Sequence, residues 1–281
     1  MKIGVTGATG QLGRLVVEQL KKRVPADAIV ALVRTPSKAA DLGVESREFD
    51  YNSPDGLAGV LVGIDRLLLI SSSEIGQRAR QHANVIEAAK KAGVKWIVYT
   101  SLLHADTSSL SLAEEHKATE KVLKESGIPY TLLRNGWYTE NYTGSIPGAI
   151  AAGAFIGSAS NGKIASAARA DFAEAAAVVL TNQDHQNKIY ELAGDDAYTL
   201  ADLAAEVSRQ SGKVIPYQNL SEADYAGALK SVGLPEGLAY AIAGWDVAAS
   251  KNDLFDNGHH LSKLIGRATT SLSVSVAAAL A

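Results

Sequence analysis

The chain opens with Lys2-Ile3-Gly4-Val5-Thr6, which runs directly into Gly7-Ala8-Thr9-Gly10-Gln11-Leu12-Gly13. The first five of these residues predict a strand, and from Gln11 the apolar positions follow the period of an amphipathic helix. A phosphate at a helix N-terminus meets unpaired backbone N–H groups and the positive end of the helix dipole. A Cβ atom on the tight turn would hold the ligand away from the backbone. The order strand, glycine turn, helix therefore predicts a pyrophosphate site formed by Gly7, Thr9, Gly10, Gln11, Leu12 and Gly13, with a ligand-free turn as the alternative.

Composition limits the possible functions. The 281 residues carry a net charge of −3, which argues against a general nucleic-acid binder. Cysteine is absent, so disulfides, thiol catalysis and cysteine-ligated metals are excluded. We find neither a secretory signal nor an uncharged apolar run of about 18 residues, the length needed for a membrane span, and we therefore expect a cytoplasmic protein.

Short apolar strands alternate with helical segments over the first half of the chain. This alternation predicts an α/β fold, a doubly wound parallel sheet covered on both faces. We expect a Rossmann domain over residues 1–140 and a smaller α+β lobe over 141–281, from which the chain could cross back to the first domain. The expected strands are 2–6, 29–33, 45–49, 67–70, 96–99, 130–133, 188–192 and 214–218, and the expected helices are 11–23, 36–42, 53–61, 76–92, 112–126, 170–181, 199–211, 221–232 and 259–265.

Arg34 follows the second expected strand. An acidic residue at this position would accept hydrogen bonds from the ribose in the adenosine half of a bound dinucleotide. Its planar five-donor guanidinium suits a 2′-phosphate instead. This residue predicts a preference for NADPH over NADH. The alternative is a solvated surface arginine.

Other polar residues follow the remaining expected strands, at the edge where open α/β sheets bind ligands. Asp50 could reach the adenine amino group, although its surroundings also suit a turn. The serines after the fourth strand could bind a ribose or could simply be loop residues. The complete set is Asp50, Ser71, Ser72, Ser73, Thr100, Ser101, Asn135, Gly136, Trp137 and Tyr138.

These segments together resemble the atypical short-chain dehydrogenases of the NmrA-like type, along essentially the whole chain. The loops Leu69–Glu74, Thr100–Thr107 and Ser262–Gly266 most resemble the quinone-reducing bacterial branch of that family. The resemblance implies NADPH bound by Gly7–Gly13, Arg34, Ser71–Ser73 and the segment from Asn135 onward. It also implies hydride transfer to a quinone lodged between two lobes.

The chain departs from ordinary short-chain dehydrogenases at the proton-donating pair. None of its ten tyrosines has a lysine four residues later. His116 and Glu120 occupy the corresponding helix at the same interval, and Ser101 lies about where the serine of the usual triad would be. Alcohol–ketone chemistry is therefore disfavoured.

A quinone needs a strong enzymic acid less than a ketone does, since its reduction yields an aromatic ring. His116 is our candidate proton donor because the ordinary histidine pKa lies near neutrality, with an exposed helix residue as the alternative. His104, Trp137 and Tyr138 are candidates for binding the substrate. The two aromatic residues could instead pack the hinge between the lobes. The histidines do not build a metal site, and His259 and His260 would diverge on a helix.

Three functions remain open. The favoured one is an NADPH-dependent quinone reductase. A non-catalytic dinucleotide sensor would share the glycine turn and the missing Tyr–Lys pair, and a reductase of another flat electrophile, such as a dye, would too. The sequence leaves the oligomeric state undetermined.

Overall fold

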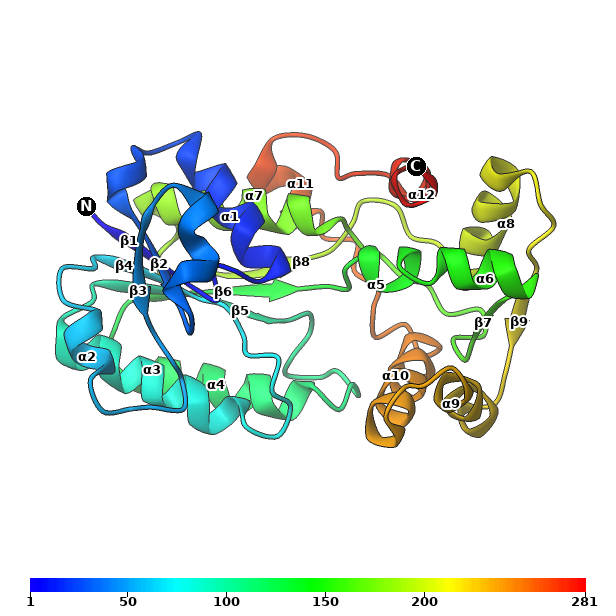
Figure 1. Ribbon diagram of the computed structural model, residues 1–281, viewed down its shortest axis with the longest axis horizontal. Coiled ribbons are helices and arrows are strands. Elements are labelled where there is room, and N and C mark those ends of the chain that lie inside the picture. Colours follow the sequence, from blue (N-terminus) through cyan, green and yellow to red (C-terminus); the bar gives the residue numbers. More distant parts are fainter.

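Seven parallel strands form one sheet in the computed structural model, which describes residues 1–281 (Figure 1). The strand order is β3-β2-β1-β4-β5-β6-β8. This arrangement confirms the predicted doubly wound parallel sheet. The strands are β1 (Ile3–Thr6), β2 (Ile29–Val33), β3 (Glu45–Glu48), β4 (Arg66–Leu69), β5 (Trp96–Leu102), β6 (Tyr130–Asn135) and β8 (Ile189–Leu192).

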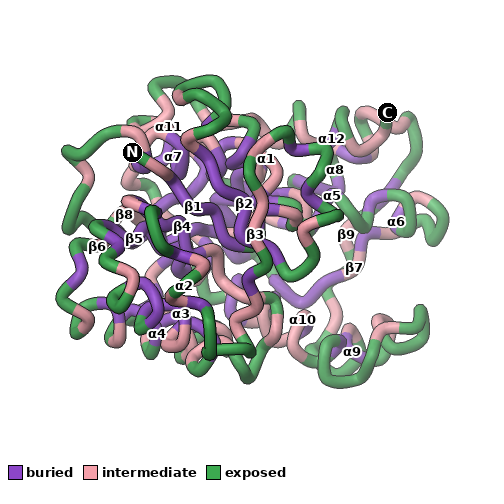
Figure 2. The backbone as a smooth tube through the Cα atoms, turned by 60° about the vertical axis from the view of Figure 1, so that its left-hand side comes forward, coloured by how far each residue is buried: buried purple, intermediate pink, exposed green.

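Helices cover both faces of this sheet, which is why its central strands are mainly apolar. One face packs against α1 (Gln11–Lys21), α7 (Arg169–Thr181) and α11 (His260–Ile265) around 26 buried hydrophobic residues. The other face packs against α2 (Leu57–Val60), α3 (Arg78–Ala92) and α4 (Ala113–Glu125). Figure 2 shows the buried strands at the centre of the molecule. Short 3-10 helices span Ala26–Ala28, Pro36–Leu42 and Gln183–His185.

The smaller lobe faces the carboxyl edge of the sheet (Figure 1) and has its own core of 20 buried residues. Its two-stranded parallel sheet pairs β7 (Phe155–Gly157) with β9 (Tyr217–Asn219), and the latter lies later in the chain than the predicted strand 214–218. Its helices are α5 (Glu140–Thr143), α6 (Ile146–Ala152), α8 (Leu200–Ser211), α9 (Glu222–Ser231), α10 (Glu236–Ala249) and α12 (Leu272–Leu280).

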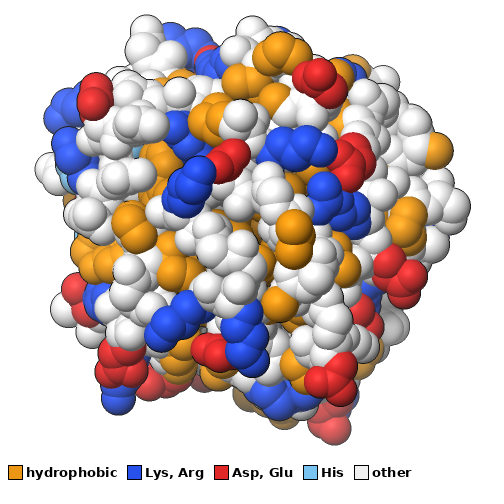
Figure 3. Space-filling model, turned by 90° about the vertical axis from the view of Figure 1, so that its left-hand side faces the viewer, with side chains coloured by type: hydrophobic (Ala, Val, Ile, Leu, Met, Phe, Trp, Pro, Cys, Tyr) orange, Lys and Arg blue, Asp and Glu red, His pale blue; other side chains and the backbone are white.

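The two lobes are interleaved along the chain. After β7 the chain returns to the large sheet, where α7 packs on α1 and β8 pairs with β6. Helix α11 also lies on the large sheet, against α7. A division at residue 140 therefore separates the lobes only in part. On the opposite side, near the amino ends of the strands, acidic and basic side chains are interspersed (Figure 3).

Candidate functional site

The glycine turn between β1 and α1 leaves a helix terminus open. Gly7 has a positive φ of +58°, and Gly10 N–H donates to the Gly7 carbonyl at 2.9 Å. A Cβ on Gly13 would lie 2.3 Å from that carbonyl oxygen, so only glycine lets the helix approach the turn so closely. Gly10 begins α1 without a side-chain cap. The backbone N–H groups of the first turn are thus available to an anion.

Arg34, the residue after β2, is held loosely beside this turn. Its side chain is 69% exposed, and its Nη1 lies 3.2 Å from Glu74 Oε1. The other oxygen of Glu74 accepts hydrogen bonds from Gln81 and Asn52, at 2.8 and 3.3 Å. An acidic side chain therefore lies beside the arginine that we predict to bind a 2′-phosphate.

Two segments are expected to contact the adenosine half of the cofactor, the turn at Asp50 and the serine loop after β4. Different contacts hold them in place. Asp50 accepts a hydrogen bond from Asn52 N–H at 3.0 Å, so it forms the turn that the sequence also allowed, and its contact with adenine stays a prediction. The serine loop after β4 is held by its backbone. Ser71 N–H donates to Thr100 Oγ1 at 2.9 Å, and Ser72 N–H donates to His82 Nε2 at 3.0 Å. Ser73 is exposed.

Thr100 and Ser101 do not end the fifth strand as expected, because β5 continues to Leu102. Both residues are buried. The Ser101 hydroxyl donates to Glu120 Oε1 at 2.7 Å. The hydroxyl hydrogen is therefore used within the protein, while the oxygen can still accept a hydrogen bond, and a contact with the cofactor stays a prediction.

His116 lies in the core rather than on the surface. It is 4% exposed, which makes the exposed-helix alternative wrong, and its Nδ1 lies 2.7 Å from the Tyr99 hydroxyl. Burial lowers the pKa of His116 to about 3, and the charge of Arg78 contributes to this shift. The imidazole is therefore neutral at pH 7. We chose His116 as a candidate proton donor because we assumed a near-neutral pKa, and that assumption is wrong.

Glu120, four residues along α4, is bound to an arginine from the sheet. Arg134 donates to both of its carboxylate oxygens at 2.9 Å and to Glu191 at 2.7 Å. His104 lies close to this network, with Nε2 3.3 Å from Asp256 and its backbone N–H donating to Glu191. These contacts anchor His104 and do not favour a substrate-binding role. A hollow of about 360 Å³ beside the network has no apolar wall for a flat substrate and is lined by Asp106, Lys117, Glu120, Lys121, Lys124, Glu125 and Arg134.

The segment after β6 joins the two lobes. The Tyr138 ring packs edge-on against Phe172 of the large lobe, with 5.2 Å between centroids, and the Trp137 ring packs against Trp245 of α10 at 5.6 Å. This confirms the hinge-packing alternative, while their contact with a substrate stays a prediction. Gly136 is required here, because a Cβ would lie 2.8 Å from the Leu192 carbonyl oxygen.

Unpaired polar atoms lie at the same edge of the sheet. Asn135 is 5% exposed, and its Oδ1 has no hydrogen-bond partner. Arg78, at the start of α3, has a buried Nη1 without a partner. Sequence reasoning missed Arg78, because an arginine in a helical segment gives the same pattern whether it is solvated or buried. It also missed Trp245, which lies on an unpredicted helix.

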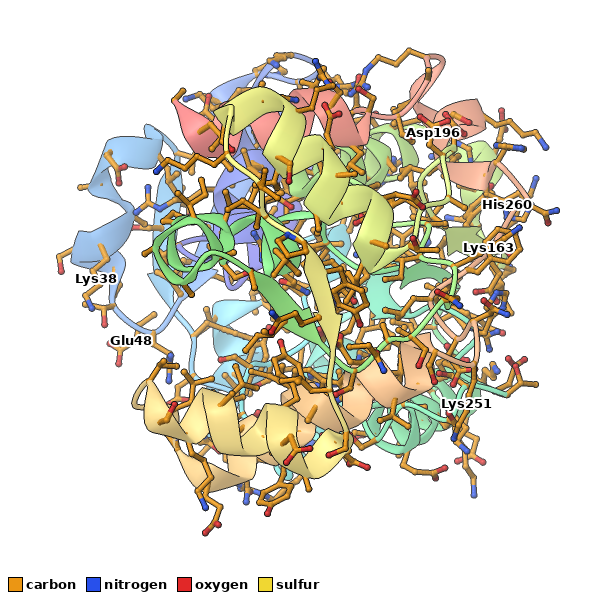
Figure 4. All side chains as sticks on the ribbon, turned by 90° about the vertical axis from the view of Figure 1, so that its right-hand side faces the viewer. Lys38, Glu48, Lys163, Asp196, Lys251 and His260 are labelled. Atoms are coloured by element: carbon orange, nitrogen blue, oxygen red, sulfur yellow. The ribbon has the colours of Figure 1, made fainter.

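The other histidines are separately partnered. His259 Nδ1 lies 2.9 Å from Asp195, whereas His260 Nδ1 accepts from Glu191 N–H at 3.3 Å, which confirms that the two rings diverge. His260 and Asp196 lie at the margin of the molecule (Figure 4). Nowhere do three histidine or acidic side chains come together in a way that could hold a metal ion. No helix has both the length and the apolar character to cross a membrane.

Three features together define a dinucleotide-binding α/β protein. They are an uncapped helix behind a glycine turn, an arginine after the second strand, and unpaired polar atoms at the carboxyl edge. Together they fit an NADP-type cofactor: the turn that a Cβ would fill suits the pyrophosphate, and Arg34 suits the additional phosphate. The chain belongs to the NAD(P)H-binding family, whose model matches residues 7–183.

Its relatives include reductases with known structures. It is 62% identical to quinone oxidoreductase 2 of Escherichia coli K12 over 98% of this chain and 97% of that protein. The crystal structure of an E. coli NADPH-dependent quinone oxidoreductase complexed with NADPH superposes with a TM-score of 0.97 at 61% identity, over 99% of this chain and all of that one.

Two more distant relatives extend the comparison. Citrobacter triphenylmethane reductase complexed with NADP(H) gives a TM-score of 0.95 at 40% identity, over 99% of this chain and all of that one. An NmrA-like oxidoreductase of Aspergillus flavus is 30% identical over 81% of this chain and 77% of that protein. The resemblance to the NmrA-like family is thus confirmed.

Proposed function

We propose that this protein is an NADPH-dependent quinone oxidoreductase. The observation that carries the proposal is the 62% identity to the E. coli quinone oxidoreductase along nearly the whole of both chains. The carboxyl edge of the sheet agrees with this activity, since it offers cofactor-binding geometry without the Tyr–Lys pair of alcohol–ketone enzymes.

Each part of the edge has a separate task. The uncapped start of α1 binds the pyrophosphate, and Arg34 binds the 2′-phosphate. When bound, NADPH supplies the hydride. The Ser71–Ser73 loop, held by Thr100 and His82, shapes the wall over β4. The segment 135–138 lies between the lobes and positions a flat quinone while excluding water.

A second candidate is the reduction of a dye-like electrophile, favoured by the 40% identity to triphenylmethane reductase. Both activities need a flat slot and a bound hydride donor. A non-catalytic sensor is the third possibility.

One assay tests all three. Purified protein is mixed with NADPH or NADH and with 1,4-benzoquinone, a naphthoquinone or a triphenylmethane dye, and the loss of reduced-nicotinamide absorbance is followed. We expect quinone turnover with NADPH preferred. Faster turnover of the dye would favour the second function, and NADPH binding without turnover of any acceptor would favour the sensor.

A further inference from the structure

Arg78 carries a charged donor that the protein itself does not satisfy. Its Nε donates to the Ser72 carbonyl, while its Nη1 is buried without a partner. A buried N–H group of a charged side chain is costly to leave unpaired. Buried polar atoms of this kind in a native fold call for a specific explanation, and a bound ligand is one.

The guanidinium lies among the ends of three neighbouring strands. Ser72 follows β4, Tyr99 lies in β5 and Tyr138 follows β6. Burial lowers the pKa of Arg78, and the negative charge of Glu115 opposes that shift. In turn, the positive charge of Arg78 contributes to the lowered pKa values of His82 and His116. Arg78 therefore faces the centre of the carboxyl edge.

A second unsatisfied atom belongs to the same cluster. Asn135 Nδ2 donates to the Tyr138 hydroxyl at 3.4 Å, and its buried Oδ1 remains unpaired. The edge over β4–β6 thus presents a cationic donor from Arg78 and a neutral acceptor from Asn135. Such a pair suits a ligand that carries both an oxygen acceptor and a hydroxyl donor.

The position of Arg78 separates it from the phosphate-binding groups. The glycine turn follows β1 and Arg34 follows β2, on the other side of the sheet order β3-β2-β1-β4-β5-β6. Neighbouring strands lie about 4.8 Å apart, so Ser72, which follows β4 and accepts from Arg78, lies one strand spacing from β1 and about 10 Å from β2. Arg78 is better placed for the reacting end of the site than for the pyrophosphate.

We propose that Arg78 binds the quinone oxygen on which negative charge develops, and that Asn135 accepts a hydrogen bond from the reduced product. This inference rests on the proposed function. A quinone that takes up a hydride, and with it two electrons, becomes the monoanion of the hydroquinone. One proton from water then completes the product. A cationic donor aimed at that oxygen stabilises the anion as it forms, a role that neutral His116 cannot fill.

The test uses 4-nitrophenol as a stable mimic of the hydroquinone anion. The full-length protein is saturated with NADP⁺, and the phenolate absorbance of the bound probe is titrated against pH. We expect wild type to lower the pKa of the bound phenol by about 1 unit or more, because an opposite charge within hydrogen-bonding range has that effect. We expect Arg78→Met to abolish this pKa shift and Arg78→Lys to retain part of it. Arg80→Met, at an exposed arginine on the same helix, leaves the shift unchanged.

Two further measurements complete the test. Affinity for NADPH, followed by fluorescence, should change less than twofold in Arg78→Met, while kcat with benzoquinone falls about 100-fold. Failure of wild type to bind or acidify the phenol, or an unchanged shift in Arg78→Met, would overturn the inference. A tenfold loss of NADPH affinity in Arg78→Met would also overturn it, because Arg78 would then be a cofactor ligand. Quinone turnover by wild type tests the proposed function separately.

Discussion

Single residues at the carboxyl edge show which features of the site a sequence pattern can predict. The close approach at Gly13 was predicted from spacing alone, because a glycine turn has a fixed place in a βα unit, while the phosphate-binding role of Arg34 stays a prediction. The environment of His116 could not be predicted. Its pKa depends on burial beside Tyr99 and on the charge of Arg78, and these neighbours come from other elements. The hydrogen bond from Ser101 to Glu120 was missed in the same way, since Glu120 lies on α4.

Loss of the Arg34 guanidinium should remove the preference for NADPH. A hydrogen bond to a charged group contributes about 1.5–3 kcal/mol, so Arg34→Ala should weaken NADPH binding about 10- to 100-fold. NADH binding should stay the same, because NADH lacks the 2′-phosphate. Fluorescence titrations with both dinucleotides measure this, with Arg209→Ala as the control at an exposed arginine on α8. An unchanged ratio of the two affinities would refute the assignment.

Glu74 should oppose the same phosphate. Its carboxylate lies beside Arg34, and binding must bring a dianionic group close to it. We expect Glu74→Gln to tighten NADPH binding about 2- to 5-fold at low salt, a change within the range of an exposed ion pair. The gain should shrink at 0.5 M salt because the charges are screened. Weaker NADPH binding in this variant would show instead that Glu74 orients Arg34.

At the scale of elements, strand prediction succeeded where burial on both faces favours an apolar run, as in β2 and in β4 after Arg66. Helices α10 and α12 were not predicted. Both are rich in alanine and lack a simple apolar stripe, so their helical state depends on packing in the smaller lobe. Helix α9 is largely exposed (Figure 2) and was predicted at 221–232, close to its observed bounds.

The close approach of α1 to the glycine turn gives a prediction for this element. Gly13→Ala would place a Cβ 2.3 Å from the Gly7 carbonyl oxygen, so helix or turn must move. We expect a loss of about 1–3 kcal/mol in the free energy of unfolding, as in other overpacked sites, together with at least tenfold weaker NADPH binding. Gly59→Ala in α2 is the matched control, since its Cβ would meet nothing within 4 Å. Equal stability in the two variants, measured by urea unfolding, would contradict the packing argument.

At the scale of the whole molecule, two buried histidines of the large lobe and one buried aspartate of the smaller lobe respond to pH in opposite ways. Burial lowers the pKa values of His82 and His116 in the large lobe from 6.5 to about 3. Between these values the unfolded chain binds more protons, so stability falls as the pH drops below 6.5. Asp246 of the smaller lobe is different. Burial raises its pKa from 3.8 to about 6, so its contribution is full below pH 3.8 and is lost as the pH rises through 6.

Replacing Asp246 should separate these effects. An asparagine can still accept from Ser158 N–H, which donates to Asp246 at 2.9 Å, and it avoids a buried charge at high pH. We expect Asp246→Asn to raise the free energy of unfolding by about 1–3 kcal/mol at pH 8, at about 1.4 kcal/mol per pKa unit. The difference should disappear near pH 4. Urea unfolding at pH 8, 6 and 4 measures it, and a pH-independent difference would argue against burial of a charged carboxylate.

The sequence by itself determined the parallel sheet, the glycine turn and the arginine that follows β2, because these depend on local order along the chain. Only the tertiary structure decided how the lobes interleave and which polar groups remain unpaired. Pairing depends on contacts between residues far apart in the chain, such as Glu120 with Arg134 and Trp137 with Trp245. Packing between distant residues also buries His116 beside Tyr99 and leaves Arg78 and Asn135 with unpaired atoms at the carboxyl edge, a distinction that residue type and spacing do not contain.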